Sequence, residues 1–114
     1  MPHIIVEYSP QLEDEIDVPH MLHDMHQSLG ERLGGVERIK TRAVKIDHNV
    51  VGEQGIEGRM IHITLLLLEG RDVETKKAYS EPLCDIAKKC TNSFSSSCAV
   101  TLEVRDMDKD TYIL

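Results

Sequence analysis

The strongest strand signal in this chain is the stretch RMIHITLLLL, residues 59–68. Both alternating faces of this stretch carry apolar side chains, which is typical of a central strand that is covered on both sides. Gly70 breaks the strand, and Asp72 can cap the helix that follows. We therefore expect a β-sheet built around residues 59–68, with a helix that runs from Asp72 to about Phe94 beside it.

Two helices are indicated by apolar residues that recur every three or four positions. The first helix starts after the capping residue Asp17 and ends at Gly34-Gly35. Its apolar stripe consists of Val18, Leu22, Met25, Leu29 and Leu33. The stripe of the second helix consists of Val73, Leu83, Ala87, Cys90 and Phe94. Pro82 lies inside the second helix, so we expect a kink there or two shorter helices.

Three further strands are expected around these helices. Residues 2–8 form a first strand, and the β-branched stretch from Ile39 to Asp47 forms a second. Residues 48–58 hold three glycines and predict a loop or loose hairpin. After a loop at Ser95 to Ser97, the alternation of apolar and polar residues from Cys98 to Val104 predicts a last, half-buried strand.

The expected element order is therefore β-α-β, loop, β-α-β, within one domain over residues 1–114. Parallel strands joined across a helix take a right-handed crossover. Two such units side by side form a four-stranded mixed sheet with both helices on one face, a fold of the α/β (α+β) class. The opposite face stays open, which favours oligomerisation through it.

Composition excludes several classes of function. Lys and Arg total 13 against 20 Asp and Glu, a net charge of -7, so the chain is poorly suited to bind nucleic acid or an anionic membrane. The apolar run from Ile63 to Leu68 is too short to span a bilayer, and we expect no secretory signal. Cys84, Cys90 and Cys98 show no metal or redox spacing, and we expect them to be reduced thiols in a cytoplasmic protein.

Pro2 directly follows Met1, so removal of Met1 would expose a secondary amine at the start of a strand. Such an amine acts as a base only when it is neutral, and model α-amino groups titrate near 8. Apolar surroundings and nearby cations lower that pKa. Lys40 and Arg42 project from one face of the second strand, and Arg71 follows the central strand. These three side chains are the candidate cations, and an arginine can also bind a carboxylate through two parallel N–H bonds.

Three segments together carry a resemblance to a known family: Pro2-His3-Ile4-Ile5-Val6-Glu7, Ile39-Lys40-Thr41-Arg42 and the stretch from Thr64 to Gly70-Arg71. They resemble the 5-carboxymethyl-2-hydroxymuconate isomerase family of the tautomerase superfamily, and the likeness extends from Pro2 to about Val104. It implies a tautomerase-like homotrimer of β-α-β repeats. It also implies an amino-terminal proline that moves a proton between carbons of an unsaturated 2-hydroxy or 2-oxo acid, with no metal or organic cofactor.

The resemblance assigns roles to individual residues. Pro2 matches the catalytic base, and Arg71 matches an arginine that binds a substrate carboxylate. The second family arginine falls at Lys40, with Arg42 two residues further on. Lys40 is a departure, because an ammonium is a point charge and orients a carboxylate less than a planar guanidinium does. Two alternatives therefore stay open. One is a tautomerase with another enol substrate, and the other is a noncatalytic oligomeric module that binds a small anion or a protein partner.

Other candidate sites are weaker. His20, His23 and His26 follow one another at three-residue spacing on the first helix, so only adjacent pairs could share a metal ion, and a solvated helix edge is favoured. The cysteines have no His-Asp partners in the sequence, which disfavours a thiol nucleophile. Strand alternation points His3 away from the Pro2 side, and we expect a structural role for it.

Overall fold

The computed structural model of the protein describes residues 1–92 and 97–114. The helices and strands follow the predicted order: β1 (His3–Tyr8), α1 (Val18–Leu33), β2 (Lys40–Lys45), β3 (Arg59–Leu68), α2 (Val73–Thr91) and β4 (Cys98–Met107). Two short 3-10 helices lie at Pro10–Asp14 and Gly52–Gln54. The predictions made for Phe94 and for the loop at Ser95 and Ser96 fall outside the described residues.

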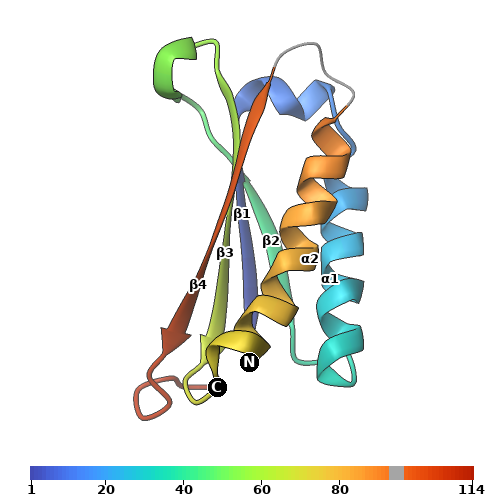
Figure 1. The fold of residues 1–114 in the computed structure, drawn as a ribbon, viewed down its shortest axis with the longest axis vertical. Coiled ribbons are helices and arrows are strands. Elements are labelled where there is room, and N and C mark those ends of the chain that lie inside the picture. The colour runs from blue at the N-terminus through green and yellow to red at the C-terminus, as the bar shows by residue number, and fades with distance from the viewer. Residues whose placement is uncertain (93–96) are drawn as a thin grey trace.

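The sheet has the strand order β2-β1-β3-β4. Strands β1 and β2 are parallel, β3 and β4 are parallel, and the two pairs meet through antiparallel pairing of β1 with β3. Figure 1 shows both helices on the same side of the sheet. The predicted mixed sheet with one helical layer is confirmed.

Strand register fixes what surrounds the start of the chain. His3 lies opposite Leu66 in the antiparallel pair, so the beginning of β1 lies beside the end of β3. His3 also lies opposite Lys40 in the parallel pair, so the beginning of β2 lies on the other side. The segments that enter β2 and leave β3 therefore both approach Pro2.

The hydrophobic core lies between the sheet and the helices. From the sheet, β3 contributes four fully buried side chains, Ile61, Ile63, Leu65 and Leu67. The helices contribute Met21, Met25, Leu29, Leu83 and Ala87, each fully buried as well. Met21 is a core residue that the predicted stripe missed, whereas Leu22 and Leu33 are only half-buried.

The prediction that β3 is covered on both sides is wrong for the single chain, because both helices pack on the same face. On the other face, which we call the open face, Leu66 and His62 are half-buried, and only Thr64 is nearly buried, with 8% of its surface exposed. Val44 of β2 is 50% exposed there, opposite Glu7 in register. Leu66 and Val44 are therefore left without a helical cover, among polar side chains of the same face.

Both helix starts form as predicted. The Asp17 carboxylate accepts a hydrogen bond from the backbone N–H of His20 at 3.1 Å, and Asp72 accepts one from Thr75 at 2.8 Å. These bonds satisfy N–H groups that have no partner inside the helix. At the other end of α1, Gly34 adopts a left-handed conformation with φ of 82°, which strongly favours glycine.

Other predicted details of the elements are wrong. Helix α2 is continuous through Pro82, so two shorter helices do not form, and the alternative, a kink at Pro82, stays a prediction. Packing of Leu83 and Ala87 on the sheet holds the helix together across the hydrogen bond that Pro82 cannot donate. Val73 is 63% exposed because it lies in the first turn of α2. Strand β2 is shorter than the predicted range 39–47 at both ends, and β4 extends to Met107.

The carboxyl-terminal tail returns to the start of β1, and the two chain ends lie at the same end of the molecule in Figure 1. The Tyr112 hydroxyl lies 2.8 Å from His3 Nε2, whereas Ile113 and Leu114 beyond it are exposed. Within residues 1–92 and 97–114, no helix combines the length and the apolar character that a membrane crossing needs.

Two substitutions in α2 test the position of the core. Leu83→Ala should lower the free energy of unfolding by about 2–5 kcal/mol, because it leaves a cavity at a fully buried site. Val73→Ala should change it by no more than about 0.5 kcal/mol, because that side chain is exposed. Urea denaturation at fixed protein concentration measures both. Equal losses would contradict this packing of α2.

Candidate active site

A cavity of about 380 Å³ lies at the amino end of β1. Its walls come from the chain start with Pro2, the end of α1 with Leu33, the approach to β2 with Arg38, and the end of β3 with Leu68 and Arg71. Residues far apart in the sequence thus meet at one place, as the strand register requires. Of the predicted site residues, Pro2 and Arg71 line this cavity together.

Pro2 is held at the cavity by backbone contacts. Pro2 is buried, and its carbonyl oxygen accepts a hydrogen bond from the Lys40 N–H at 3.0 Å. The left-handed turn at Gly34 directs the chain from α1 toward β2, past Pro2. The start of β1 is therefore fixed on a rigid strand and does not depend on a long side chain for its position.

Arg71 is also fixed, although it is only half-buried. Its Nη1 donates a hydrogen bond to the carbonyl oxygen of Leu68 at 3.2 Å. Its guanidinium carbon lies 5.7 Å from the centre of the Tyr79 ring, a distance suited to a cation–π contact. One of the five N–H donors is used in this way, so the group can still bind a carboxylate through two others.

The electrostatic surroundings of the chain start favour a neutral amine. Burial is the first cause that lowers the pKa of the Met1 amino group, followed by the positive charges of Arg38, Arg71 and Lys40. Both effects disfavour an ammonium ion. A basic nitrogen at this place is therefore neutral at a lower pH than an ordinary α-amino group is.

Within one chain, Lys40 and Arg42 lie apart from the cavity that Pro2 and Arg71 share. Register and alternation place both on the open face, with His3 and Ile5, and neither lines the cavity around Pro2. The charge of Lys40 reaches the amino group, whereas Arg42 Nη1 lies 3.0 Å from His3 Nδ1.

His3 belongs to the open face, as alternation predicts. An arginine can only donate a hydrogen bond, so the His3 Nδ1 beside Arg42 is the acceptor and Nε2 carries the proton toward Tyr112. Burial lowers the pKa of His3, and the charge of Arg42 lowers it further. His3 is thus a neutral side chain that joins β1, β2 and the tail.

Arg38 is a cavity residue that the sequence analysis missed. The predicted second strand began at Ile39, so Arg38 was assigned to no element. Its proximity to Pro2 depends on the parallel pairing of β1 and β2, which brings the residues just before β2 to the chain start. The sequence did offer one signal for Arg38: it is a basic residue directly before a strand that is expected to pair in parallel with the first strand.

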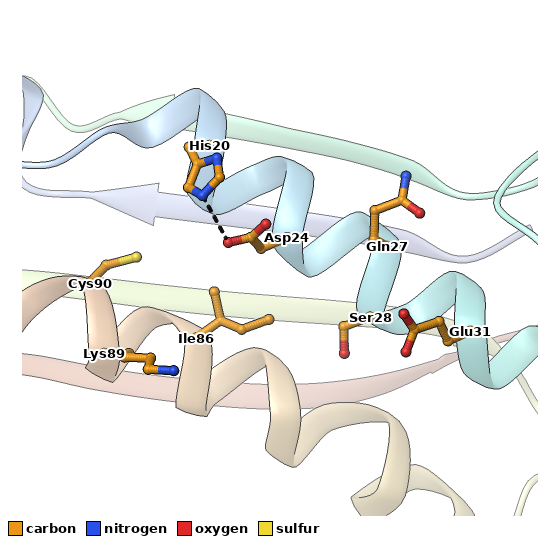
Figure 2. Close-up of a pocket in the computed structure, with 8 residues that line it drawn as sticks. All are labelled: His20, Asp24, Gln27, Ser28, Glu31, Ile86, Lys89 and Cys90. Atoms are coloured by element: carbon orange, nitrogen blue, oxygen red, sulfur yellow. Dashed lines mark ion pairs between the residues drawn. The ribbon is translucent and has the colours of Figure 1, made fainter.

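A second cavity, of about 520 Å³, lies between the helices and is separate from Pro2. Figure 2 shows it between α1 and α2, with the His20–Asp24 ion pair at 3.3 Å on one wall and Cys90 on the other. Burial raises the pKa of the Cys90 thiol, and the charges of Asp24 and Asp17 raise it further, so the thiolate is disfavoured. This larger cavity therefore lacks both a ready nucleophile and converging cations.

The three histidines of α1 have separate surroundings. His20 pairs with Asp24, His26 Nδ1 lies 2.7 Å from Thr41 Oγ1, and His23 is exposed. In the part of the chain that the structure describes, no three His, Cys, Asp or Glu side chains are grouped to hold a metal ion.

Comparison with known proteins identifies the family of the chain. The sequence model of a family described as 5-carboxymethyl-2-hydroxymuconate isomerase matches residues 2–113. No curated protein matches the chain.

Three solved structures share the fold at low sequence identity. A 5-carboxymethyl-2-hydroxymuconate delta-isomerase matches with a TM-score of 0.83 and 14% identity, over 100% of this chain and 87% of its own. A 5-carboxymethyl-2-hydroxymuconate isomerase from Deinococcus radiodurans R1 matches with a TM-score of 0.88 and 19% identity, over 99% and 87%. A fused 4-OT symmetric trimer matches with a TM-score of 0.71 and 16% identity, over 95% and 88%.

The family match spans nearly the whole chain, and the structural matches independently give the same fold. The chain therefore belongs to the 5-carboxymethyl-2-hydroxymuconate isomerase family and is an isomerase with the tautomerase fold.

Proposed function

We propose that Pro2, once Met1 has been removed, moves a proton between carbons of an unsaturated 2-hydroxy (enol) polycarboxylate such as 5-carboxymethyl-2-hydroxymuconate. The observation that carries this proposal is the shared cavity of Pro2 and Arg71, in surroundings that disfavour an ammonium ion. In this proposal, residues 1–114 act as one domain in the cytoplasm. The reaction uses side chains and the terminal amine of the protein, without a metal or an organic cofactor.

The chemistry follows from the two groups in the cavity. Arg71 binds a carboxylate of the substrate and orients its carbon chain over Pro2. The neutral amine takes the hydroxyl proton of the enol, or, in the unconjugated 2-oxo tautomer, the proton of the carbon beside the ketone. The amine becomes an ammonium, and negative charge develops on the oxygen of the resulting dienolate. Nearby cations stabilise that oxygen. The ammonium then returns the proton at another carbon, which gives the conjugated ketone and regenerates the amine.

Lys40 and Arg42 contribute to carboxylate binding in this proposal only through the assembled protein. Both lie on the open face of the sheet, where a neighbouring chain would pack. There, Lys40 and Arg42 would face the boundary between two chains and act on a substrate near it. Within its own chain, Lys40 supports Pro2 through its charge.

We also propose that three copies of the chain assemble through their open faces. The half-buried Leu66 lacks a helical cover in the single chain, and the matching fused 4-OT structure is a trimer. Two neighbouring copies would supply the missing cover, because burial of this apolar area stabilises the assembly.

The role of Pro2 can be tested by substitution. We expect Pro2→Ala to lower kcat/KM for 2-hydroxymuconate-type enols by about 100-fold or more, because acid–base catalysis contributes that much. An ultraviolet assay measures turnover, and circular dichroism and the oligomeric mass should stay unchanged. Full activity of Pro2→Ala would disprove the proposal, as would an intact mass that shows Met1 retained in protein from the native host.

The pH dependence tests the electrostatic surroundings of the amine. Burial first, and then the charges of neighbouring cations, lower the pKa of the Met1 amino group at this place. We expect the same of the Pro2 amine, so the acidic limb of kcat/KM should lie below the value near 8 of a model α-amino group. Lys40→Gln removes one cation, raises the amine pKa and should move this limb to higher pH, whereas Lys40→Arg should leave it in place. An NMR titration of the Pro2 amine gives the same quantity without turnover. An unmoved limb in Lys40→Gln would contradict the effect of this charge.

The assembly is tested by light scattering after size exclusion. The wild type should show the mass of three 12.9-kDa chains. Leu66→Glu should give monomers, because it places a charge in the proposed interface. Val73→Glu is the matched control, since Val73 is exposed on α2, and it should remain trimeric. A monomeric wild type would rule out the assembly.

A tautomerase with a different enol substrate is the second candidate. The observation that favours it is Lys40, which stands where the resemblance places an arginine. A panel of enol mono-, di- and tricarboxylates separates the two candidates through the ranking of kcat/KM.

A further inference from the structure

Two arginines line the cavity around Pro2. Arg71 enters from the end of β3, and Arg38 enters from the segment that leads into β2. These segments lie on opposite sides of the start of β1, because β1 pairs with both strands. The amino end of the chain thus lies between two arginines that approach from different directions.

The backbone around Arg38 is fixed. The Ile39 N–H donates to the carbonyl oxygen of Val36 at 3.0 Å, and the Lys40 N–H donates to that of Pro2, also at 3.0 Å. Ile39 itself is buried in the core, with 5% of its surface exposed. The Cα of Arg38 is therefore held beside Pro2, and only its side chain has to move to reach a ligand.

The Arg38 guanidinium differs from those of the other arginines. The other five each have a side-chain contact with a protein group: Arg32 with Ser28, Arg42 with His3, Arg59 with Glu15, Arg71 with Leu68 and Arg105 with Glu103. Arg38 makes no such hydrogen bond or ion pair within residues 1–92 and 97–114. Its N–H donors are available in a cavity that already holds a second guanidinium.

Glu37 also lines the cavity, and its carboxylate would compete if it paired with Arg38. No ion pair joins Glu37 to Arg38 within residues 1–92 and 97–114. The Glu37 carboxylate lies against the backbone of Gly35, where an added Cβ would collide with it. Because Gly35 has no side chain, Glu37 can fold back there. Two cations against one anion leave the cavity positive.

We propose that Arg38 is a specificity-determining residue that binds the second carboxylate of an enol dicarboxylate whose first carboxylate is bound by Arg71. The inference rests on the proposed function of the Pro2 cavity. The reacting carbons would then lie between the two carboxylates, over the Pro2 nitrogen. A monocarboxylate would use Arg71 alone and gain nothing from Arg38.

The test compares two substrates in three variants. Arg38→Gln should raise KM for 2-hydroxymuconate, a dicarboxylate, by about 10- to 100-fold, because a charged hydrogen-bonding partner is lost. The same variant should change kcat/KM for enol-phenylpyruvate, a monocarboxylate, by less than about 3-fold at a pH above the acidic limb. Arg38→Lys should restore part of the loss, since it keeps the charge without the planar fork. Arg32→Gln, which removes an equal charge outside the cavity, should match the wild type.

Direct binding separates this inference from the proposed function. Calorimetry with muconate, a dicarboxylate, and sorbate, its monocarboxylate counterpart, needs no turnover. Arg38→Gln should weaken muconate by about 10-fold or more and leave sorbate nearly unchanged, even if the wild type converts no enol. Equal effects on both ligands, or no effect on muconate, would overturn the role of Arg38. Lack of turnover with selective loss of muconate binding would overturn only the catalytic role of Pro2.

Discussion

The antiparallel pairing of β1 with β3 determines which side chains surround the start of the chain. With His3 opposite Leu66, the chain start can lie only at the end of the sheet where β3 leaves toward Arg71. The parallel pairing of β1 with β2 then brings Arg38 to the same end. A shift of one residue would turn Pro2 to the open face and separate it from these side chains.

Local charge outweighs overall charge at this end of the molecule. The chain carries a net charge of -7, yet burial first, and then the positive charges of Arg38, Arg71 and Lys40, lower the pKa of the terminal amino group. Distant acidic side chains are screened by water and salt, whereas partly buried neighbours are screened less. An acidic protein can therefore maintain a cationic site, provided that the backbone gathers a few basic residues from separate segments.

The sequence predicted those parts of the fold that depend on local patterns. The bounds of β3, the caps at Asp17 and Asp72 and the stop at Gly34 all follow from nearby residues, and each is confirmed. Val73 was misplaced because helical periodicity does not show where a helix extends beyond the sheet. Arg38 was missed because its position depends on strand pairing between residues that are far apart in the sequence.

One-sided packing connects the fold to the site. The cavity of Pro2 is lined by the end of α1 and by the segments that enter β2 and leave β3, whereas Lys40 and Arg42 lie on the open face. A single chain thus divides its basic residues between two surfaces, with Arg38 and Arg71 in one group. In the proposed trimer, the second group would lie at a boundary between chains, where burial strengthens its electrostatic effect. Arg38 needs no such boundary to reach the amine, so carboxylate selection would belong to the chain itself, and assembly would add cover for β3 and further positive charge.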